Sequence, residues 1–396
     1  MFRSWEKGAD PQGRRWPDAV RVTDHVGVDH VVVTRHALVR RVLADPHTFR
    51  PDNALDAVTP MPVTALRVLA EHGFRLPPTL ANNGGASHPE IRAIVAEALH
   101  PHRVERQRPW LAGMVRARVD RLAAALDAGE PVDLYAELAA DLPLLVLARL
   151  VDLPDAGVAT VKEFTRAALE LFWAPVDAER QRALAGTVGR FHAVLREFAT
   201  TGPGLAAALR TAGHRPDVVV GALFFLLVAG QETTSQFLTL LLHRLAGEPA
   251  VLDGLRSGRI EVADVVEEGL RVEPPIVTWR RVAAVDTTLG DTEVPRGTSV
   301  VLWLAHAGRD PAVVAAPDEF RPGQPGSRRH LAFGAGAHRC VGAQLSRMEA
   351  AVVVELAAPL LAGATVVRPP WCPDNLSFRM PDAFVIRRDA PAAVPA

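Results

Sequence analysis

The chain of 396 residues has little cysteine and lysine, no excess of charge of either sign and no flavin- or nicotinamide-binding signature. Two cysteines, Cys340 and Cys372, exclude a disulfide framework and fit a reducing cytosol. Lysine occurs only at Lys7 and Lys162, so the basic charge is almost wholly arginine. A formal net charge of −1 gives no reason to expect nucleic acid or an anionic membrane as a partner. Because no Gly-x-Gly-x-x-Gly unit lies on a βαβ pattern, we expect no flavin- or nicotinamide-binding domain in the chain.

Membrane-spanning and multidomain signals are also missing. The first fifteen residues, MFRSWEKGADPQGRR, have no apolar core, so we expect neither a signal peptide nor an anchor there. The most apolar stretch, residues 218–230, is shorter than the roughly 18 residues of a spanning helix. We therefore expect a cytoplasmic protein, and a monomer. Without a linker or a repeat, residues 1–396 are expected to form one domain.

Most of the chain is predicted to be helical, with a minor β part. Apolar residues at helical spacing predict helices over 89–99, 104–128, 134–151, 155–174, 177–200, 216–246 and 341–361. Strands are expected over 25–34, 278–289, 292–295, 299–304 and 384–388. This gives a helix-rich core, residues 86–275 and 341–361, and a β-rich part, about residues 25–35, 276–304 and 376–390.

Cys340 lies in the sequence Phe-Gly-Ala-Gly-Ala-His-Arg-Cys-Val-Gly, residues 333–342, just before a predicted helix. Its sulfur would lie at a helix N-terminus, where free backbone N–H groups and the helix dipole favour an anion. A cysteine that is a thiolate at this position is better interpreted as a metal ligand than as an inert core cysteine. Because Cys372 alone cannot complete a zinc or iron–sulfur set, one axial bond to a haem fits best. The alternative is a buried structural cysteine behind a turn.

The complete motif Phe-Gly-x-Gly-x-His-x-Cys-x-Gly resembles that of the cytochrome P-450 family. The resemblance implies the P-450 fold, with a long central helix over the haem, and haem b with an axial thiolate from Cys340. It also implies that His338 hydrogen-bonds a haem propionate, the alternative being a histidine that faces solvent. Phe333, Gly334 and Gly342 are expected to contact the cofactor from the same loop.

A second segment, Ala229-Gly230-Gln231-Glu232-Thr233-Thr234, lies inside the predicted central helix. Glycine and threonine are poor choices for a helix interior, and a threonine there tends to bond back to the i−4 carbonyl. The segment resembles the acid–alcohol pair of the family. That implies catalytic roles for Glu232 and Thr233 in proton delivery, with Ala229 and Gly230 close to the cofactor. The alternative is a solvated polar patch or a packing glycine.

Further charged pairs match the family pattern. Glu268 and Arg271, at i and i+3, resemble its structural Glu-x-x-Arg pair, and Arg321 falls in the segment that packs on it. His88 and Arg92 share one helix face and, with Arg281, are expected to bind the haem propionates. Arg280 is the competing residue for the role of Arg281, and the two would point to opposite faces of a strand.

The resemblance implies a haem-thiolate monooxygenase that uses O2 and takes electrons from a ferredoxin and its reductase, with NAD(P)H as the ultimate donor. Hydroxylation or epoxidation of a mainly hydrophobic small molecule is expected, in bacterial secondary metabolism. Oxidative coupling, desaturation, aromatic nitration and a haem-based sensor remain alternatives. Candidate ferredoxin-docking residues are Arg103, Arg106, Arg328, Arg329, Arg339 and Arg347. Candidate substrate-pocket residues are Leu80, Asn82, Phe172, Trp173, Phe225, Ile276, Val277, Thr278 and Phe378.

Overall fold

The protein is described here by a computed structural model that covers residues 17–24, 26–153 and 158–388. The expectations for the N-terminal segment 1–15, for Lys7, for residue 25 of the first predicted strand and for residues 155–157 of one predicted helix lie outside these described residues.

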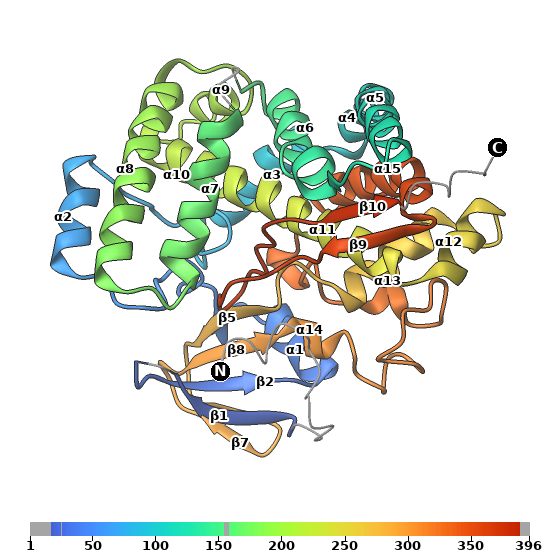
Figure 1. The fold of residues 1–396 in the computed structure, drawn as a ribbon. Coiled ribbons are helices and arrows are strands. Elements are labelled where there is room, and N and C mark those ends of the chain that lie inside the picture. The colour runs from blue at the N-terminus through green and yellow to red at the C-terminus, as the bar shows by residue number, and fades with distance from the viewer. Residues whose placement is uncertain (1–16, 25, 154–157, 389–396) are drawn as a thin grey trace, which may run out of the picture.

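Helices make up most of the described chain (Figure 1). They are α1 (His36–Ala44), α2 (Val63–Glu71), α3 (His88–Ala98), α4 (Pro101–Glu105), α5 (Arg108–Asp127), η2 (Tyr135–Ala139), α6 (Leu142–Val151), α7 (Val158–Trp173), α8 (Ala178–Thr201), α9 (Gly204–Thr211), α10 (Pro216–Leu227), η3 (Val228–Glu232), α11 (Thr233–Ala246), α12 (Pro249–Arg256), α13 (Val262–Val272), α14 (Leu304–Ala307), the short turns η4 (Ser327–Arg329) and η5 (Gly336–His338), and α15 (Ala343–Leu361).

The strands form small sheets; that of β1, β2, β5 and β8 lies at one edge of the helical body, whereas β9 and β10 lie over its helices (Figure 1). They are β1 (Ala19–Thr23), β2 (Asp29–Val33), β3 (Phe49–Arg50), β4 (Val132–Asp133), β5 (Thr278–Ala283), β6 (Thr287–Leu289), β7 (Thr292–Val294), β8 (Ser299–Trp303), β9 (Ala364–Arg368) and β10 (Val385–Arg388). The sheet orders are β1-β2-β8-β5-β3, β4-β10-β9 and β6-β7. Strands β2 and β8 are parallel, whereas β5 pairs with β8 antiparallel. The predicted class, mainly α with a minor β part, is confirmed.

Three predicted elements are divided in the structure. The strand predicted over 278–289 is two strands, because β5 pairs with β8 whereas β6 pairs with β7. The helix predicted over 104–128 is divided into α4 and α5, and the one over 134–151 into η2 and α6. In both cases a proline, Pro109 or Pro143, lies at the start of the second helix, where its missing N–H ends the preceding hydrogen-bond ladder.

The predicted central helix is continuous over Pro216–Ala246, built from α10, η3 and α11. Within the described residues it is the helix that is long and apolar enough to cross a membrane, but 72% of its most apolar window is buried inside the protein. It is therefore the core helix, and α15 packs against it, against α5 and against α13. Figure 1 shows α11 passing through the middle of the molecule.

Candidate active site

An apolar cavity lies between the central helix, strand β5, the start of α3 and the loop that carries Cys340. It brings together four segments that are far apart in the sequence. The lining residues used below are Leu80, His88, Arg92, Leu147, Phe225, Ala229, Gly230, Thr233, Thr234, Ile276, Trp279, Arg281, Leu304, Phe333, Gly334, His338, Cys340, Gly342 and Ser346.

The Cys340 loop reaches the cavity through two glycines with positive φ angles, Gly334 at +65° and Gly336 at +68°. A Cβ atom on Gly336 would lie 2.5 Å from the carbonyl oxygen of Leu43 in α1, so only glycine fits there. The same Cβ on Gly334 would meet nothing within 4 Å, so its need for glycine is conformational alone. The loop then returns to its own start, because the N–H of Cys340 donates to the carbonyl of Phe333 at 2.8 Å.

The Cys340 thiol lines the cavity, and helix α15 begins three residues later with Gly342 at its N-cap. Burial raises the pKa of the Cys340 thiol, and the Gly342 N–H and the Arg92 and Arg339 guanidinium groups act against that rise. These donors and cations are the surroundings that stabilise a thiolate once a metal ion shares its charge.

Four nitrogen-bearing side chains meet at another part of the cavity wall. The rings of His88 and His338 lie 4.0 Å apart, centre to centre. Burial lowers the pKa of His88, and Arg92 lowers it further. Burial also lowers the pKa of His338 to about 4, helped by the positive charge of its neighbours. The guanidinium of Arg281 is only 2% exposed, and burial lowers its pKa to about 10.

These four groups have no acidic partner among the described residues. Arg281 donates to the carbonyl of Arg280, Arg92 donates to the carbonyl of Arg339 at 2.5 Å, and Nδ1 of His338 has no partner within the described part of the chain. The lowered pKa values favour the neutral form of the two histidines, whereas Arg92 and Arg281 remain charged, and a buried charge without a counter-ion is costly. A cavity with such a set on its wall therefore fits a ligand that brings carboxylates of its own, as haem does, with Cys340 available as the single thiol.

The structure separates the two candidate arginines on β5. Arg281 and Trp279 point into the cavity from one face of the strand, as residues two apart must. Arg280 lies on the other face, where it donates to the carbonyls of Ala54 and Asp56.

The central helix opens where the sequence predicted an interruption. Residues Val228–Glu232 form a π-turn, and the hydroxyl of Thr233 donates back to the carbonyl of Ala229 at 2.5 Å. Gly230 lines the cavity, but a Cβ there would lie 2.9 Å from Cδ2 of Leu147. The room made by this glycine is thus partly filled by α6 and is not left wholly to a ligand.

Glu232 is fully buried but does not line the cavity. Its Oε1 accepts a hydrogen bond from the Thr165 hydroxyl at 2.8 Å and lies 3.0 Å from the ammonium of Lys162, both on α7. Thr233, the next residue, lines the cavity. The acid and the alcohol therefore lie on different sides of the central helix.

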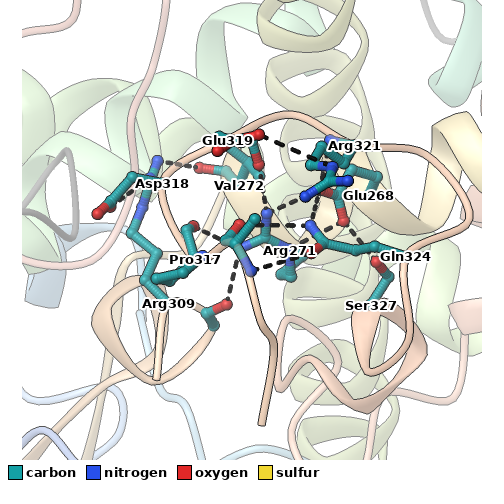
Figure 2. Close-up of polar contacts among 12 residues, drawn as sticks. Glu268, Arg271, Val272, Arg309, Pro317, Asp318, Glu319, Arg321, Gln324 and Ser327 are labelled. Carbon is teal, nitrogen blue, oxygen red and sulfur yellow. Dashed lines mark hydrogen bonds and ion pairs between the residues drawn. The ribbon is translucent and has the colours of Figure 1, made fainter. Parts of the chain in front are cut away.

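Glu268 and Arg271 form a buried bidentate pair on α13, with N–O distances of 2.9 and 2.7 Å (Figure 2). Arg271 also donates to three carbonyls of the segment that precedes the Cys340 loop, those of Gly308, Pro317 and Glu319. Arg321 does take part, but through its backbone N–H, which donates to Glu268 at 2.8 Å, while its side chain is 59% exposed.

Two partners of this pair escaped the sequence analysis. Gln324 Nε2 and Ser327 Oγ donate to Glu268 at 2.7 and 2.6 Å (Figure 2). Burial alone would raise the pKa of Glu268, but the hydrogen bonds from Arg271, Ser327 and the Arg321 N–H outweigh burial and lower it. The pair is thus an anchor that holds the 308–327 segment against α13.

A second buried carboxylate beside it was also missed. Glu267 lies 3.2 Å from the ring of His330 and accepts from Nε of Arg347 at 2.5 Å, so its pKa falls to about 2 although burial opposes the shift. The Arg347 guanidinium also lies over the ring of Phe333 at 4.5 Å. Glu267 thereby fixes Phe333 and the start of the Cys340 loop, and no local pattern marks a pairing across 80 residues.

The predicted substrate-pocket residues divide into two groups. Leu80, Phe225 and Ile276 line the cavity. The others lie outside its lining: Asn82, Phe172, Trp173, Val277, Thr278 and Phe378.

The direction in which side chains point on β5 and its neighbours explains why some predicted residues do not line the cavity. The Thr278 hydroxyl donates to the carbonyl of Leu376 on the outer face of the strand, and Asn82 Oδ1 accepts from the N–H of Thr79. Trp279 takes the inner position instead, and Trp173 stacks behind it at 6.3 Å. Trp279 was missed, although strand alternation places it on the same face as Arg281, two residues further along the strand.

Comparisons with known proteins define the class. A protein-family model described as Cytochrome P450 matches residues 262–357. The chain is 33% identical to the cytochrome P450 monooxygenase PikC of Streptomyces venezuelae, over 85% of this chain and 79% of PikC. It is 31% identical to linalool 8-monooxygenase of Pseudomonas putida, over 68% and 67% of the two chains. A structure of cytochrome P450 CREJ with (4-ethylphenyl) dihydrogen phosphate has a TM-score of 0.87 and 25% identity, over 93% and 94% of the chains.

The chain belongs to the cytochrome P450 family. Its fold is the P450 fold, and it is an oxidoreductase of the monooxygenase class. The cofactor of this family is haem with an axial cysteine thiolate.

Proposed function

We propose that the protein is a haem-thiolate monooxygenase that inserts one atom of dioxygen into a mainly hydrophobic small molecule, by hydroxylation or epoxidation, in bacterial secondary metabolism. The observation that carries this proposal is one apolar cavity whose wall holds a single thiol, two arginines without an acidic partner among the described residues, and Thr233 directly after the Val228–Glu232 π-turn. Membership of the family that includes PikC and linalool 8-monooxygenase supports it.

The haem would be held by Cys340 as axial ligand, with its propionates on His88, Arg92, Arg281 and His338. The remaining contacts would come from Ala229, Gly230, Phe333, Gly334 and Gly342. When bound, haem supplies dioxygen binding and activation, and a thiolate ligand favours O–O cleavage.

Glu232 and Thr233 would deliver protons. Thr233 lines the cavity, and because its hydroxyl proton is donated to the Ala229 carbonyl, its oxygen can accept a hydrogen bond there. Glu232 can take protons from the other side of the helix. Its carboxylate must turn from Lys162 to pass them on. A Thr233→Ala variant should divert reducing equivalents to hydrogen peroxide; coupling of reductant to product equal to wild type would exclude this role.

The substrate would be mainly apolar. The cavity wall is built from Leu80, Phe225, Ile276, Trp279 and Leu304, and such walls bind hydrophobic ligands with few polar contacts. A library of such compounds, scored by the shift they cause in the ferric spin state of the loaded protein, would identify the substrate class. Analysis of the oxidised product would separate oxygen insertion from coupling, desaturation or nitration.

Electrons would come from a ferredoxin and its reductase, with NAD(P)H as donor. Several of the predicted docking arginines are already engaged: Arg347 with Glu267, Arg328 with Asp264 at 3.0 Å and Arg103 with the carbonyl of Leu150. Arg103 and Arg328 are nevertheless exposed, as are Arg106, Arg329 and Arg339. Docking that depends on them should weaken as salt increases, and reduction rates that do not change with salt would contradict it.

We also propose that the chain is a single domain that acts in the cytoplasm as a monomer. The burial of the central helix inside the protein argues against its use as a membrane span. The spectrum of the reduced, CO-treated protein tests the whole proposal: the expected result is that of a thiolate-ligated haem, lost in Cys340→Ala. An imidazole-type spectrum in wild-type protein would exclude it.

A further inference from the structure

The side of the cavity formed by β5 is an aromatic layer two residues deep. Trp279 lines the cavity, and Trp173 lies nearly parallel behind it, with ring centres 6.3 Å apart and an angle of 25° between the rings. The ring of Phe378 meets Trp279 and Trp173 edge to face, at 6.2 and 5.0 Å. We call these three residues the aromatic cluster. Its two rear members are almost fully buried, so Trp279 is supported from behind and cannot withdraw from the cavity.

The aromatic cluster is held together by residues 375–379, which join β5 to the end of α7. On the β5 side, the N–H of Val277 donates to the carbonyl of Ser377 at 2.8 Å. On the α7 side, the N–H of Leu376 donates to the carbonyl of Trp173 at 2.7 Å. This short segment therefore sets the distance between the strand and the helix end that carry the two tryptophans.

The Asn375 side chain fixes the shape of this segment. It is buried, and its Oδ1 accepts from the N–H groups of Ser377 and Phe378 at 3.0 and 2.8 Å. An asparagine that bonds in this way to the backbone just after it closes a tight turn. Its Nδ2 donates to the carbonyl of Leu169 in α7 at 3.2 Å. One side chain thus holds the backbone of Phe378 and ties it to α7, although Asn375 does not itself line the cavity.

Away from the groups that would hold the haem, the side chains of the lining are apolar except for the hydroxyl groups on α11 and α15. Leu80, Phe225 and Ile276 belong to this apolar part. The polar side chains expected in the pocket, Asn82 and Thr278, instead bond to backbone groups outside the lining. Contact with β5 therefore recognises a substrate by its shape and its rings and not by a hydrogen bond from a side chain.

We propose that Trp279 is a specificity-determining residue that selects compounds with an aromatic ring lying against its indole, and that Asn375 is the positioning residue that acts through the aromatic cluster. The inference rests on the proposed function and names the substrate class of the same site. Offset-stacked or edge-to-face ring contacts contribute more than the apolar area they bury, about 2- to 12-fold in affinity. Substrates with an aromatic ring should gain this factor over saturated compounds of the same shape class.

The first test compares the binding of naphthalene and decalin, which share one carbon skeleton, to the haem-loaded protein through the shift of its ferric spin state. Decalin is the more apolar of the two, so burial of apolar surface alone would favour it. We expect wild-type protein to bind naphthalene about 2- to 12-fold more tightly than decalin. This preference should fall in Trp279→Leu. It should be unchanged in Trp110→Leu, because Trp110 lies on α5 under the guanidinium of Arg149 and does not line the cavity.

The second test asks whether Asn375 acts through the aromatic cluster. Asn375→Ala removes the acceptor of two N–H groups and should lower the preference for naphthalene by about twofold or more, whereas Asn375→Asp keeps the acceptor oxygen and should retain most of the preference. Phe378→Leu, which leaves the backbone hydrogen bonds in place, should also lower it. Gln181→Ala is the matched control, because Gln181 is similarly buried on α8 and its Nε2 donates to the carbonyl of Thr59 at 2.9 Å. The control should lose thermal stability with an unchanged ratio of the two affinities.

The inference would be overturned if wild-type protein bound naphthalene no more tightly than decalin, or if Trp279→Leu kept the full preference. The role of Asn375 would be overturned by a wild-type preference in whichever of Asn375→Ala and Phe378→Leu folds, or by an equal loss in Gln181→Ala. A crystal structure with naphthalene should place its ring centre about 4.5–7 Å from that of the Trp279 indole, and a ring held by other side chains alone would contradict the proposal. An imidazole-type CO spectrum would instead refute the proposed function, so the two failures are distinguishable.

Discussion

Removal of the Glu268 carboxylate is the perturbation whose size follows most directly from the structure. Glu268 accepts two hydrogen bonds from Arg271 and one each from the Arg321 N–H, Gln324 and Ser327, all in the interior. In Glu268→Ala the guanidinium of Arg271 keeps its three carbonyl acceptors but loses its counter-charge. The variant therefore leaves a buried cation and three donors without an acceptor.

The expected cost is large. Breaking a buried ion pair by removing one partner costs about 3–5 kcal/mol. The unsatisfied donors add on the order of 1 kcal/mol each where water cannot reach them. We expect Glu268→Ala to lose about 4–8 kcal/mol, the upper value with all three donors out of reach of water. This is comparable with the whole stability of many domains, about 5–15 kcal/mol. Because the 308–327 segment leads into the Cys340 loop, haem retention should fall as well.

Denaturant unfolding followed by circular dichroism, together with the ratio of bound haem to protein, measures both effects. Arg321→Ala is the matched control, since Arg321 contributes its backbone N–H and its side chain is 59% exposed. It should change stability by less than about 0.5 kcal/mol. A loss below about 1 kcal/mol in Glu268→Ala, or an equal loss in Arg321→Ala, would refute the reasoning, since the buried-pair cost would then be absent.

Three further changes have definite expected outcomes. Gly336→Ala combines a φ of +68° with a Cβ 2.5 Å from the Leu43 oxygen, whereas Gly334→Ala has the strained φ without the clash. Gly336→Ala should therefore lose more stability, measured by calorimetry, and more bound haem than Gly334→Ala. The pKa of Glu267 is about 2 in the folded protein against an ordinary 4.5. This shift contributes about 3 kcal/mol to the free energy of unfolding above pH 4.5, and the contribution is lost as the pH falls toward 2. Unfolding curves of Glu267→Gln should lack this acid-dependent loss of stability. Trp279→Ala should change which compounds shift the ferric spin state, whereas Thr278→Ser should not, and equal effects would contradict the placement of the two side chains.

Local pattern was enough to predict the elements whose periodicity is strong. The central helix was predicted over 216–246 and is continuous over those residues because its apolar content and its Pro and Gly-Glu-Pro boundaries are local signals. The Cys340 loop is likewise predictable from its motif, since Gly334 and Gly336 both adopt positive φ angles, although the close approach of Leu43 to Gly336 is a tertiary contact. The helix divisions at Pro109 and Pro143 could also have been predicted from the two prolines. They were missed because the apolar spacing continues across both prolines.

Pocket residues were harder to predict, because which residue of a strand or loop faces a cavity depends on its partners. Trp279 faces inward and Thr278 outward because β5 pairs with β8 and its outer face packs on the chain near Leu376. Residues such as Phe172 and Phe378 are aromatic and near in space, yet they pack behind the wall or away from it. Hydrophobicity alone does not distinguish these positions.

The sequence by itself was enough to propose Cys340 as the thiol that binds iron and Glu232 and Thr233 as the acid and alcohol, and to predict the charged pair on α13, because each is a short motif whose spacing carries its chemistry. Tertiary structure alone decided that Glu232 turns toward Lys162 and Thr165, that Arg281 and not Arg280 enters the cavity, and that Glu267 joins Arg347 and His330. These contacts join residues tens of positions apart, and their geometry is fixed only when the helices and strands that carry them pack together.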